Sequence, residues 1–112
     1  MSQDQKYNGW NNYETWLCKL WMDNDQGLHE LQNEWALEAM QENDNVKEDA
    51  RGDLADRLES FWDDMQEESG IHSNGFFADM INAAMRMIDW HEIAENILSD
   101  IDVYVAGWNM PE

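Results

Sequence analysis

Basic residues are scarce in this chain of 112 residues: 6 Lys plus Arg stand against 25 Asp plus Glu, so the formal net charge is −19. Binding to the phosphates of DNA or RNA, or to an anionic membrane face, needs a cation for each contact. We therefore expect no direct binding to nucleic acid and no binding to a membrane. The same imbalance of charge predicts a basic protein as the partner.

Cysteine and β-branched residues are also few. The single cysteine, Cys18, excludes an internal disulfide and a CxxC pair for zinc. Val, Ile and Thr together number only ten, which argues against a fold based on β-sheet. No apolar run is long enough to span a bilayer, and the first six residues lack the apolar stretch of a signal peptide. We therefore expect a cytoplasmic protein.

Apolar residues recur at helical spacing along most of the chain and predict about five helices. The first follows an N-cap at Asn11 or Asn12 and ends at a turn over residues 23–27. Three more cover about residues 28–40, 46–67 and 76–88, and a fifth follows a cap at Asp89 and ends near residues 99–101. Residues 101–105 alternate like a strand, and either continue the helix or form an extended tail. The predicted fold is all-α: one compact bundle over residues 1–112, with flexible ends at 1–8 and 106–112.

Each predicted helix carries an apolar stripe that we expect to face the core. The residues expected inward are Tyr13, Trp16, Leu17, Leu20, Trp21, Leu28, Leu31, Trp35, Ala36, Ala39, Val46, Ala50, Leu54, Leu58, Phe61, Met65, Phe77, Met80, Ile81, Ala84, Met85 and Ile88. Trp90 is expected in the core as well. Trp10, Trp62 and Trp108 are either edge-of-core residues or interface anchors, because tryptophan is frequent at binding hot spots.

The acids are concentrated in the middle of the chain, where residues 23–68 hold 16 acids and 3 bases, a net −13 of the total −19. Like charges four residues apart weaken a helix by a few tenths of a kcal/mol per pair. A chain optimised for stability alone would place lysines between them. The acids instead form two rows, each opposite the apolar stripe of its predicted helix. The predicted partner-binding residues are Glu30, Glu34, Glu38, Asp49, Asp53, Asp56, Asp63, Asp64 and Glu67.

The row on the third predicted helix would be about 27 Å long, from Asp49 to Glu67. B-DNA presents one negative charge per roughly 1.7 Å of its axis, counting both strands. A groove that binds DNA should therefore also attract this surface. The alternative is that the acids are a solvated face that serves only solubility. Arg51, Arg57 and Arg86 are expected to pair with neighbouring acids.

Sites for chemistry find little support in the sequence. His91 and Glu92 begin like the HExxH zinc motif, but the second histidine is missing. Residues 23–27 resemble a calcium loop only in part, because the glycine comes one position early and the glutamate at the twelfth position is absent. Cys18 is expected to be a small buried thiol. We expect no catalytic residues, no bound metal and no cofactor, and therefore no enzyme.

The segment YNGWNNYETW, residues 7–16, resembles the N-terminal signature of a family of small phage- and plasmid-encoded proteins. In that family NGW is followed by one residue and then NYETW, and an apolar helix with a leucine–tryptophan pair comes next, matched here by Leu20 and Trp21. A second resemblance covers residues 77–84 and 89–95. The resemblance implies phages and mobile elements as the context, where small proteins often act against host defences. It implies no catalytic residues.

In charge, size and helicity the chain is also similar to phage proteins that mimic DNA, such as anti-restriction proteins, anti-CRISPR proteins and inhibitors of uracil-DNA glycosylase. The leading hypothesis is an acidic mimic that blocks the DNA- or RNA-binding groove of a basic host protein, for example a CRISPR effector, a restriction enzyme or a repair enzyme. The alternative is a helical adaptor that binds a protein through a Trp-bearing apolar patch. A third reading is a regulator that sequesters a basic host factor. The sequence allows a homodimer, which would extend the charged surface.

Overall fold

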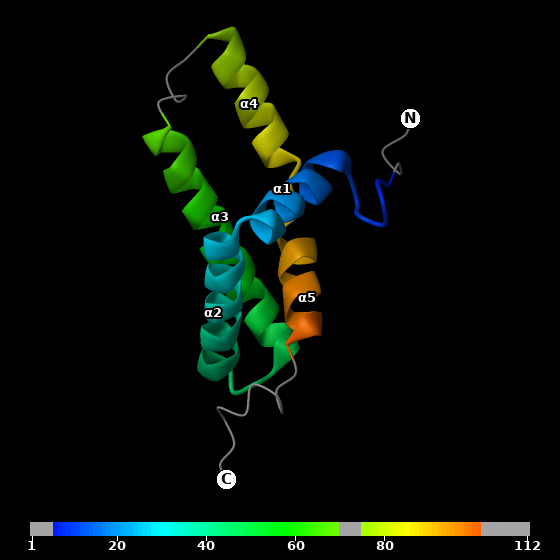
Figure 1. The fold of residues 1–112 in the computed structure, drawn as a ribbon, viewed down its shortest axis with the longest axis vertical. Helices are drawn as coiled ribbons and strands as arrows, with labels where there is room; N and C mark the ends of the chain where they lie inside the picture. The colour runs from blue at the N-terminus through cyan, green and yellow to red at the C-terminus, as the bar shows by residue number, and fades with distance from the viewer. Residues whose placement is uncertain (1–5, 70–74, 102–112) are drawn as a thin grey trace.

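The computed structural model describes residues 6–69 and 75–101, which form five α-helices (Figure 1). They are α1 (Tyr13–Asn24), α2 (Gln26–Glu42), α3 (Lys47–Glu68), α4 (Phe76–Arg86) and α5 (Trp90–Asp100). The described residues contain no β-strand, and only one isolated bridge joins Tyr7 to Trp10. The predicted all-α bundle of five helices is confirmed. The strand-like tail, Trp108 and most of both predicted flexible ends lie outside the described residues.

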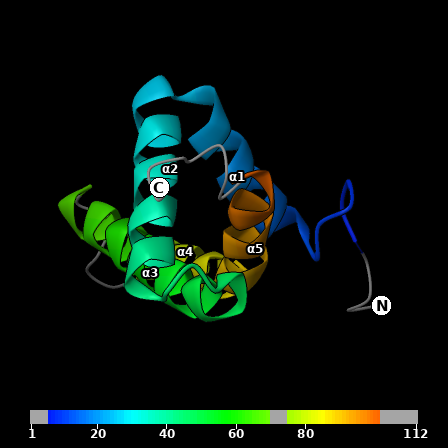
Figure 2. The same cartoon turned by 90° about the horizontal axis from the view of Figure 1, so that it is seen from below.

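The body of the bundle is built on α3, which packs against both α2 and α5, while α1 crosses the end of these two helices (Figures 1 and 2). Side chains from these helices form one buried core. Its largest fully buried apolar members are Met40, Leu54, Leu58 and Ile93. The last turns of α3 and the whole of α4 extend away from this body (Figure 1).

Three of the five helices begin at an N-cap residue whose side chain accepts a hydrogen bond from the backbone. Asn12 caps α1, because its side chain accepts a hydrogen bond from the backbone N–H of Thr15, and Asp89 caps α5 in the same way. Asp25 caps α2 through the N–H of Leu28. The predicted turn over residues 23–27 is therefore shortened to Asp25, and α2 begins two residues earlier than expected.

A hydrogen-bonded cluster joins the segment before α1 to the start of α5, about 80 residues further along the chain. The backbone N–H of Asn11 donates to Glu92 Oε1 at 3.0 Å, and the Asn11 side chain donates to Asp89 Oδ2 at 2.6 Å. Thr15 is fully buried, and its Oγ1 donates to Asn12 Oδ1 at 2.7 Å and accepts from the N–H of Asp89 at 2.9 Å. Residues 7–16 and residues 89–95, two of the segments that carry the family resemblance, are therefore in contact.

The rotation of α1 differs from the prediction. Its buried face consists of Thr15, Lys19 and Met22, while Trp21 is 65% exposed. Lys19 is held inside because its Nζ donates to Asp23 Oδ1 at 2.6 Å. Because α1 is apolar on more than one side, the spacing of its apolar residues does not fix which side is buried. On this helix the residues that were wrongly expected inward are Tyr13, Leu20 and Trp21.

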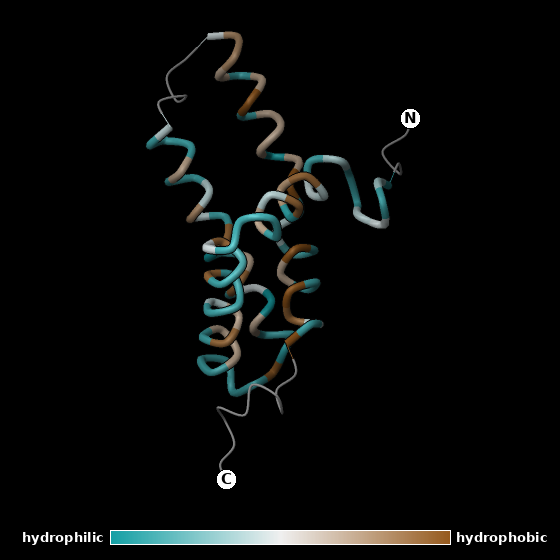
Figure 3. Tube along the Cα trace, viewed as in Figure 1, coloured by the Kyte–Doolittle hydropathy of each residue, from teal (hydrophilic) through white to brown (hydrophobic). Residues whose placement is uncertain are grey.

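The rotation of α4 also differs from the prediction. Ala78 is buried, Ile81 and Met85 are half-buried, and Asn82 Oδ1 accepts a hydrogen bond from Gln66 Nε2 of α3 at 2.7 Å. Apolar residues run along most of this helix (Figure 3), so the polar contact at Asn82 helps to decide its orientation. The prediction of an inward position was wrong for the exposed residues Phe77, Met80 and Ala84, and likewise for Val46 and Met65 near the ends of α3.

Candidate partner-binding surface

Seven of the nine predicted partner-binding acids are exposed, and two are half-buried. The exposed acids are Glu30, Glu34, Asp49, Asp56, Asp63, Asp64 and Glu67. Glu30 also accepts a hydrogen bond from Gln26 within α2. The half-buried acids are Glu38 and Asp53. The first seven can meet a partner directly, whereas the other two are held by interactions inside the chain.

Arg57 of α3 holds those two acids and joins the acidic rows of α2 and α3. Its guanidinium donates to Glu38 Oε1 at 2.8 Å, to Glu42 Oε1 at 2.9 Å and to Asp53 Oδ1 at 3.0 Å. The hydrogen bond that Arg57 donates to Asp53 raises the pKa of Arg57 above its usual value. The charge of Asp53 and the hydrogen bonds to the two glutamates add to this effect, and together they outweigh desolvation by burial, which lowers the pKa. The arginine therefore stays charged at any ordinary pH. The cluster keeps a net charge of −2, from three carboxylates and one guanidinium.

The solvent side of α3 is densely acidic. Eight carboxylates are exposed between residues 48 and 68: Glu48, Asp49, Asp56, Glu59, Asp63, Asp64, Glu67 and Glu68. The 20 steps between the first and the last of them span about 30 Å, so one charge occurs per roughly 4 Å. A single strand of B-DNA carries one phosphate per about 3.4 Å. The charge density of α3 thus approaches that of one DNA strand.

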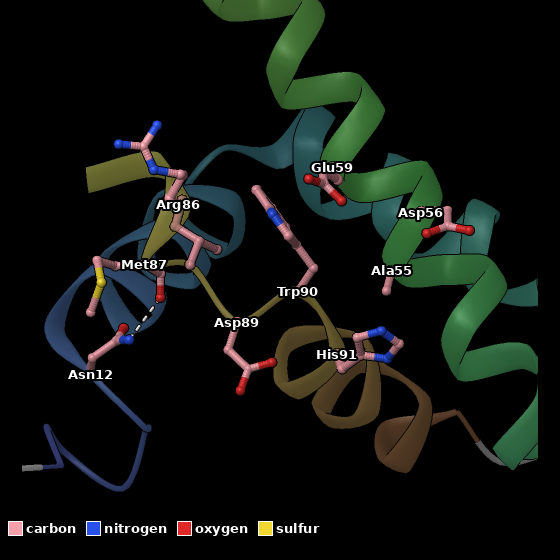
Figure 4. Close-up of a pocket in the computed structure, with 10 residues that line it drawn as sticks. Asn12, Ala55, Asp56, Glu59, Arg86, Met87, Asp89, Trp90 and His91 are labelled. Atoms are coloured by element: carbon pink, nitrogen blue, oxygen red, sulfur yellow. Dashed lines mark hydrogen bonds between the residues drawn. The ribbon is translucent and has the colours of Figure 1, made fainter. Parts of the chain in front are cut away.

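A hollow of about 420 Å³ opens beside this row, where α3 faces the link between α4 and α5 (Figure 4). Asp56 and Glu59 come from α3, Arg86 lies at the end of α4, and Trp90 and His91 begin α5. The hydrogen bond from Asn12 Nδ2 to the carbonyl oxygen of residue 87, at 2.7 Å, fixes the far wall. Three carboxylates line the hollow, those of Asp56, Glu59 and Asp89, against the single guanidinium of Arg86. This excess of negative charge suits a lysine or arginine side chain of a partner.

Glu59 was missing from the predicted site. Counting 100° per residue places it beside the acidic sector of α3 and not inside it, and only the packing of α5 against α3 shows that it lines the same hollow as Asp56. Arg51 and Arg57 pair with acids as expected, and Arg51 contacts Glu95 at 3.8 Å. Within the described ranges, no group of three or more His, Cys, Asp or Glu residues could hold a metal ion.

A second hollow, of about 220 Å³, is apolar and lies between α1, α3 and α4. Its lining includes Leu17, Trp21, Trp62, Ala84 and Met85. The indole Nε1 of Trp62 is buried and has no hydrogen-bond partner in the part of the chain that the structure describes. Trp21 was expected in the core and is instead an exposed wall of this hollow. Trp16, Trp35 and Trp90 are half-buried, and Trp10 and Trp62 pack at the edge of the core.

Cys18 also lines the apolar hollow. Burial raises the pKa of its thiol from 9.0 to about 12, because the low-dielectric surroundings disfavour the thiolate, and the charge of Lys19 offsets only part of this effect. The thiolate is the reactive form of cysteine. The residue is therefore an apolar wall of the hollow and is poorly suited to be a nucleophile.

We expect the thiol of the folded protein to react far more slowly with an aromatic disulfide reagent at about pH 8 than the thiol of the unfolded chain, since thiolate forms less readily in the folded state. The free energy of unfolding should also fall as the pH rises from 9.0 towards about 12, because only the unfolded chain loses its thiol proton in that range. A Cys18→Ala variant should lose this part of the pH dependence. Equal reaction rates in both states would contradict the assignment.

No helix among the described residues combines the length and the apolar character needed to cross a bilayer. The fold and the surface together define a small all-α protein with an acidic outer face on two adjacent helices. The chain belongs to DUF7249, a family of unknown function whose sequence profile matches residues 3–106. Comparison with the curated proteins and with the solved structures found no match.

Proposed function

We propose that this protein is an acidic mimic of nucleic acid, made by a phage or mobile element, that blocks the DNA- or RNA-binding groove of a host defence enzyme. The enzyme would be a basic protein such as a CRISPR effector or a restriction enzyme. Exposed carboxylates of α2 and α3 take the place of phosphates and pair with arginine and lysine side chains in the groove. Inhibition is by occupancy, without turnover and without a cofactor.

The observation that carries this proposal is the charge density of α3, about one exposed carboxylate per 4 Å on a rigid helix. A solvated surface normally mixes both signs of charge. On α3 the two arginines are half-buried, and the exposed Lys47 stands at the first position of the helix. A partner therefore meets a nearly uniform row of negative charge, which steers a basic groove towards it.

The hollow beside α3 adds a feature that a plain acidic helix lacks. A basic side chain that enters it contacts Asp56 and Glu59 and is partly removed from solvent there. Charge-assisted hydrogen bonds to a partly desolvated group contribute about 1.5–3 kcal/mol, more than an exposed ion pair. We therefore place the centre of the interface at this hollow and the rows of acids around it.

The test is capture from a bacterial lysate fraction that binds immobilised DNA, with the tagged full chain as bait. We expect bound proteins to elute when salt is raised from about 0.1 M to about 0.5 M, because ion pairs are screened. A duplex oligonucleotide should also release them. Failure to retain any nucleic-acid-binding protein, or retention that salt and DNA leave unchanged, would contradict the proposal.

A second candidate function is a helical adaptor that binds a protein through its apolar hollow, with the acids serving solubility. The observation in its favour is Trp21, which is 65% exposed beside the hollow that Trp62 also lines. This function predicts binding that resists salt and is lost in Trp21→Ala. The same capture experiment separates the two functions, because only the mimic is displaced by DNA.

A further inference from the structure

The outer face of α4 is apolar and largely exposed. Four large side chains on it are between 52% and 76% exposed: Phe76, Phe77, Met80 and Met87, the last directly after the helix. The opposite face, with Ala78 buried and Asn82 bonded to Gln66, is turned towards α3. Side chains of this size seldom gather on an exposed face unless the face binds something.

The charge of α4 sets it apart from the other helices. Its one acid, Asp79, is balanced by its one base, Arg86, so its net charge is zero. The net charges of α1, α2, α3 and α5 are −1, −4, −6 and −3, counted from their sequences. A basic partner has no reason to prefer α4, whereas a second copy of this strongly acidic chain can approach closely only on a neutral face.

The spacing on α4 fits pairing with a second helix. Phe76, Met80, Ala83 and Met87 follow one another at intervals of 4, 3 and 4 residues, which is the spacing of a helix–helix seam. Asp79 and Arg86 lie seven residues apart along one edge of the seam, and Phe77 and Ala84 lie seven apart along the other. Within the part of the chain that the structure describes, neither Asp79 nor Arg86 has an ion-pair partner.

We propose that α4 is the interface of a homodimer, in which the α4 helices of two copies pack antiparallel about a twofold axis. In this arrangement the edge that carries Asp79 lies beside the same edge of the second copy, running in the opposite direction. Asp79 of each copy then faces Arg86 of the other, and the symmetry forms this ion pair twice. A parallel arrangement would instead set the edge with Asp79 and Arg86 beside the edge with Phe77 and Ala84, so neither ion pair would form.

The other edge supplies shape complementarity. Antiparallel packing brings Phe77 of one copy next to Ala84 of the other, a large side chain against a small one. Ala84 also lines the apolar hollow of about 220 Å³ that Trp21 and Trp62 enclose. A phenyl ring fits into a space of this size, so each copy inserts Phe77 into the hollow of the other and covers its exposed Trp21.

The dimer should be weak and should respond to salt in an unusual direction. An interface centred on one short helix is at the low end of the size range of specific interfaces, so we expect a dissociation constant on the order of 10 μM. Each copy carries a charge of −19, and added salt screens this repulsion. Dimerisation should therefore strengthen with salt, in contrast to the binding of a basic partner. This inference does not rest on the proposed function.

Sedimentation velocity of the full chain tests the proposal over a range of concentrations up to about 100 μM, well above the expected dissociation constant. The mass should rise from 13.2 kDa towards twice that value. Met80→Glu places a charge in the seam and should leave only monomer, while its circular dichroism stays helical because the residue is exposed. A purely monomeric wild type would overturn the proposal, and it would leave the capture experiment unaffected.

A charge exchange identifies the interface itself. In Asp79→Arg two arginines face each other at each pair, and in Arg86→Asp two aspartates do, and the twofold symmetry creates this repulsion twice. Each variant should raise the dissociation constant by about tenfold or more. The double variant restores both pairs with reversed polarity and should recover most of the affinity. A dimer that persists unchanged in both single variants and in Met80→Glu would place the interface elsewhere and would also overturn the proposal.

Discussion

Thr15→Val is expected to lower the free energy of unfolding by about 2–4 kcal/mol, although valine has almost the same shape as threonine. The side chain of Thr15 is fully buried, and its hydroxyl both donates to Asn12 Oδ1 and accepts from the N–H of Asp89. Without the hydroxyl, that N–H is left partly buried and unpaired, which costs about 1–3 kcal/mol, and the N-cap of α1 loses a support. Urea denaturation followed by circular dichroism measures the change.

Thr15→Ser is the matched control, because it keeps the hydroxyl and removes only a methyl group. It should cost about 1 kcal/mol, the usual value for one buried methyl group. The difference between the two variants isolates the hydrogen bonds that tie the start of α1 to the start of α5. Equal stability of the valine and wild-type proteins would show that this cluster does not hold the two segments together.

The combined variant Asp49→Asn, Asp56→Asn and Asp63→Asn is expected to weaken binding to the captured partner by about 100-fold. The three carboxylates are exposed and lie two helical turns apart on one side of α3. If each contributes about 1 kcal/mol through pairing with a cation, their loss amounts to about 3 kcal/mol, or roughly two powers of ten in affinity. Isothermal titration at fixed salt measures it.

A control variant with the same change of net charge separates a local from a global effect. Asp44→Asn, Glu95→Gln and Asp100→Asn also remove three exposed acids, but none of them lies on α2 or α3. This variant should bind within about threefold of the wild type, because only long-range, screened attraction is reduced. An equal loss in both variants would mean that overall charge, and not the row on α3, determines the binding.

Much of the fold could be predicted from the sequence because local rules dominate in helices. The cap at Asp89, a cap at Asn11 or Asn12, and the exposure of three acids of α3 follow from side-chain type and the 3.6-residue period alone. These acids are Asp49, Asp56 and Asp63. The burial of Leu54 and Leu58 follows from the same period. In α3 one face is strongly polar and the other apolar, so only one rotation of the helix about its axis buries the apolar residues.

The rotations of α1 and α4 could not be predicted, because these helices are apolar on more than one side. In α1 the buried face is fixed by polar contacts of Thr15 and Lys19, and in α4 by the contact of Asn82 with α3. Such contacts join residues that are distant in the sequence or that look like surface residues. Trp21 was for this reason expected in the core and is instead exposed.

The candidate surface was predicted in outline but not in detail. Helical periodicity does not distinguish Glu38 and Asp53 from the other acids of the two rows. In the structure both form ion pairs with Arg57. It also gives no sign that Glu59 shares a hollow with Asp56, since the opposite wall comes from residues about 30 positions away. A binding site on several helices depends on their packing, and periodicity within one helix does not contain that information.

The central claim is that the acidic face of α2 and α3 competes with nucleic acid for the same groove. The most direct measurement is displacement of a fluorescent duplex oligonucleotide from the captured partner, followed by anisotropy. We predict that the wild-type protein displaces the duplex completely, and that the variant with Asp49, Asp56 and Asp63 changed to Asn needs about 100-fold more protein to do so. Simultaneous binding of duplex and protein to the partner, or equal displacement by both proteins, would contradict the claim.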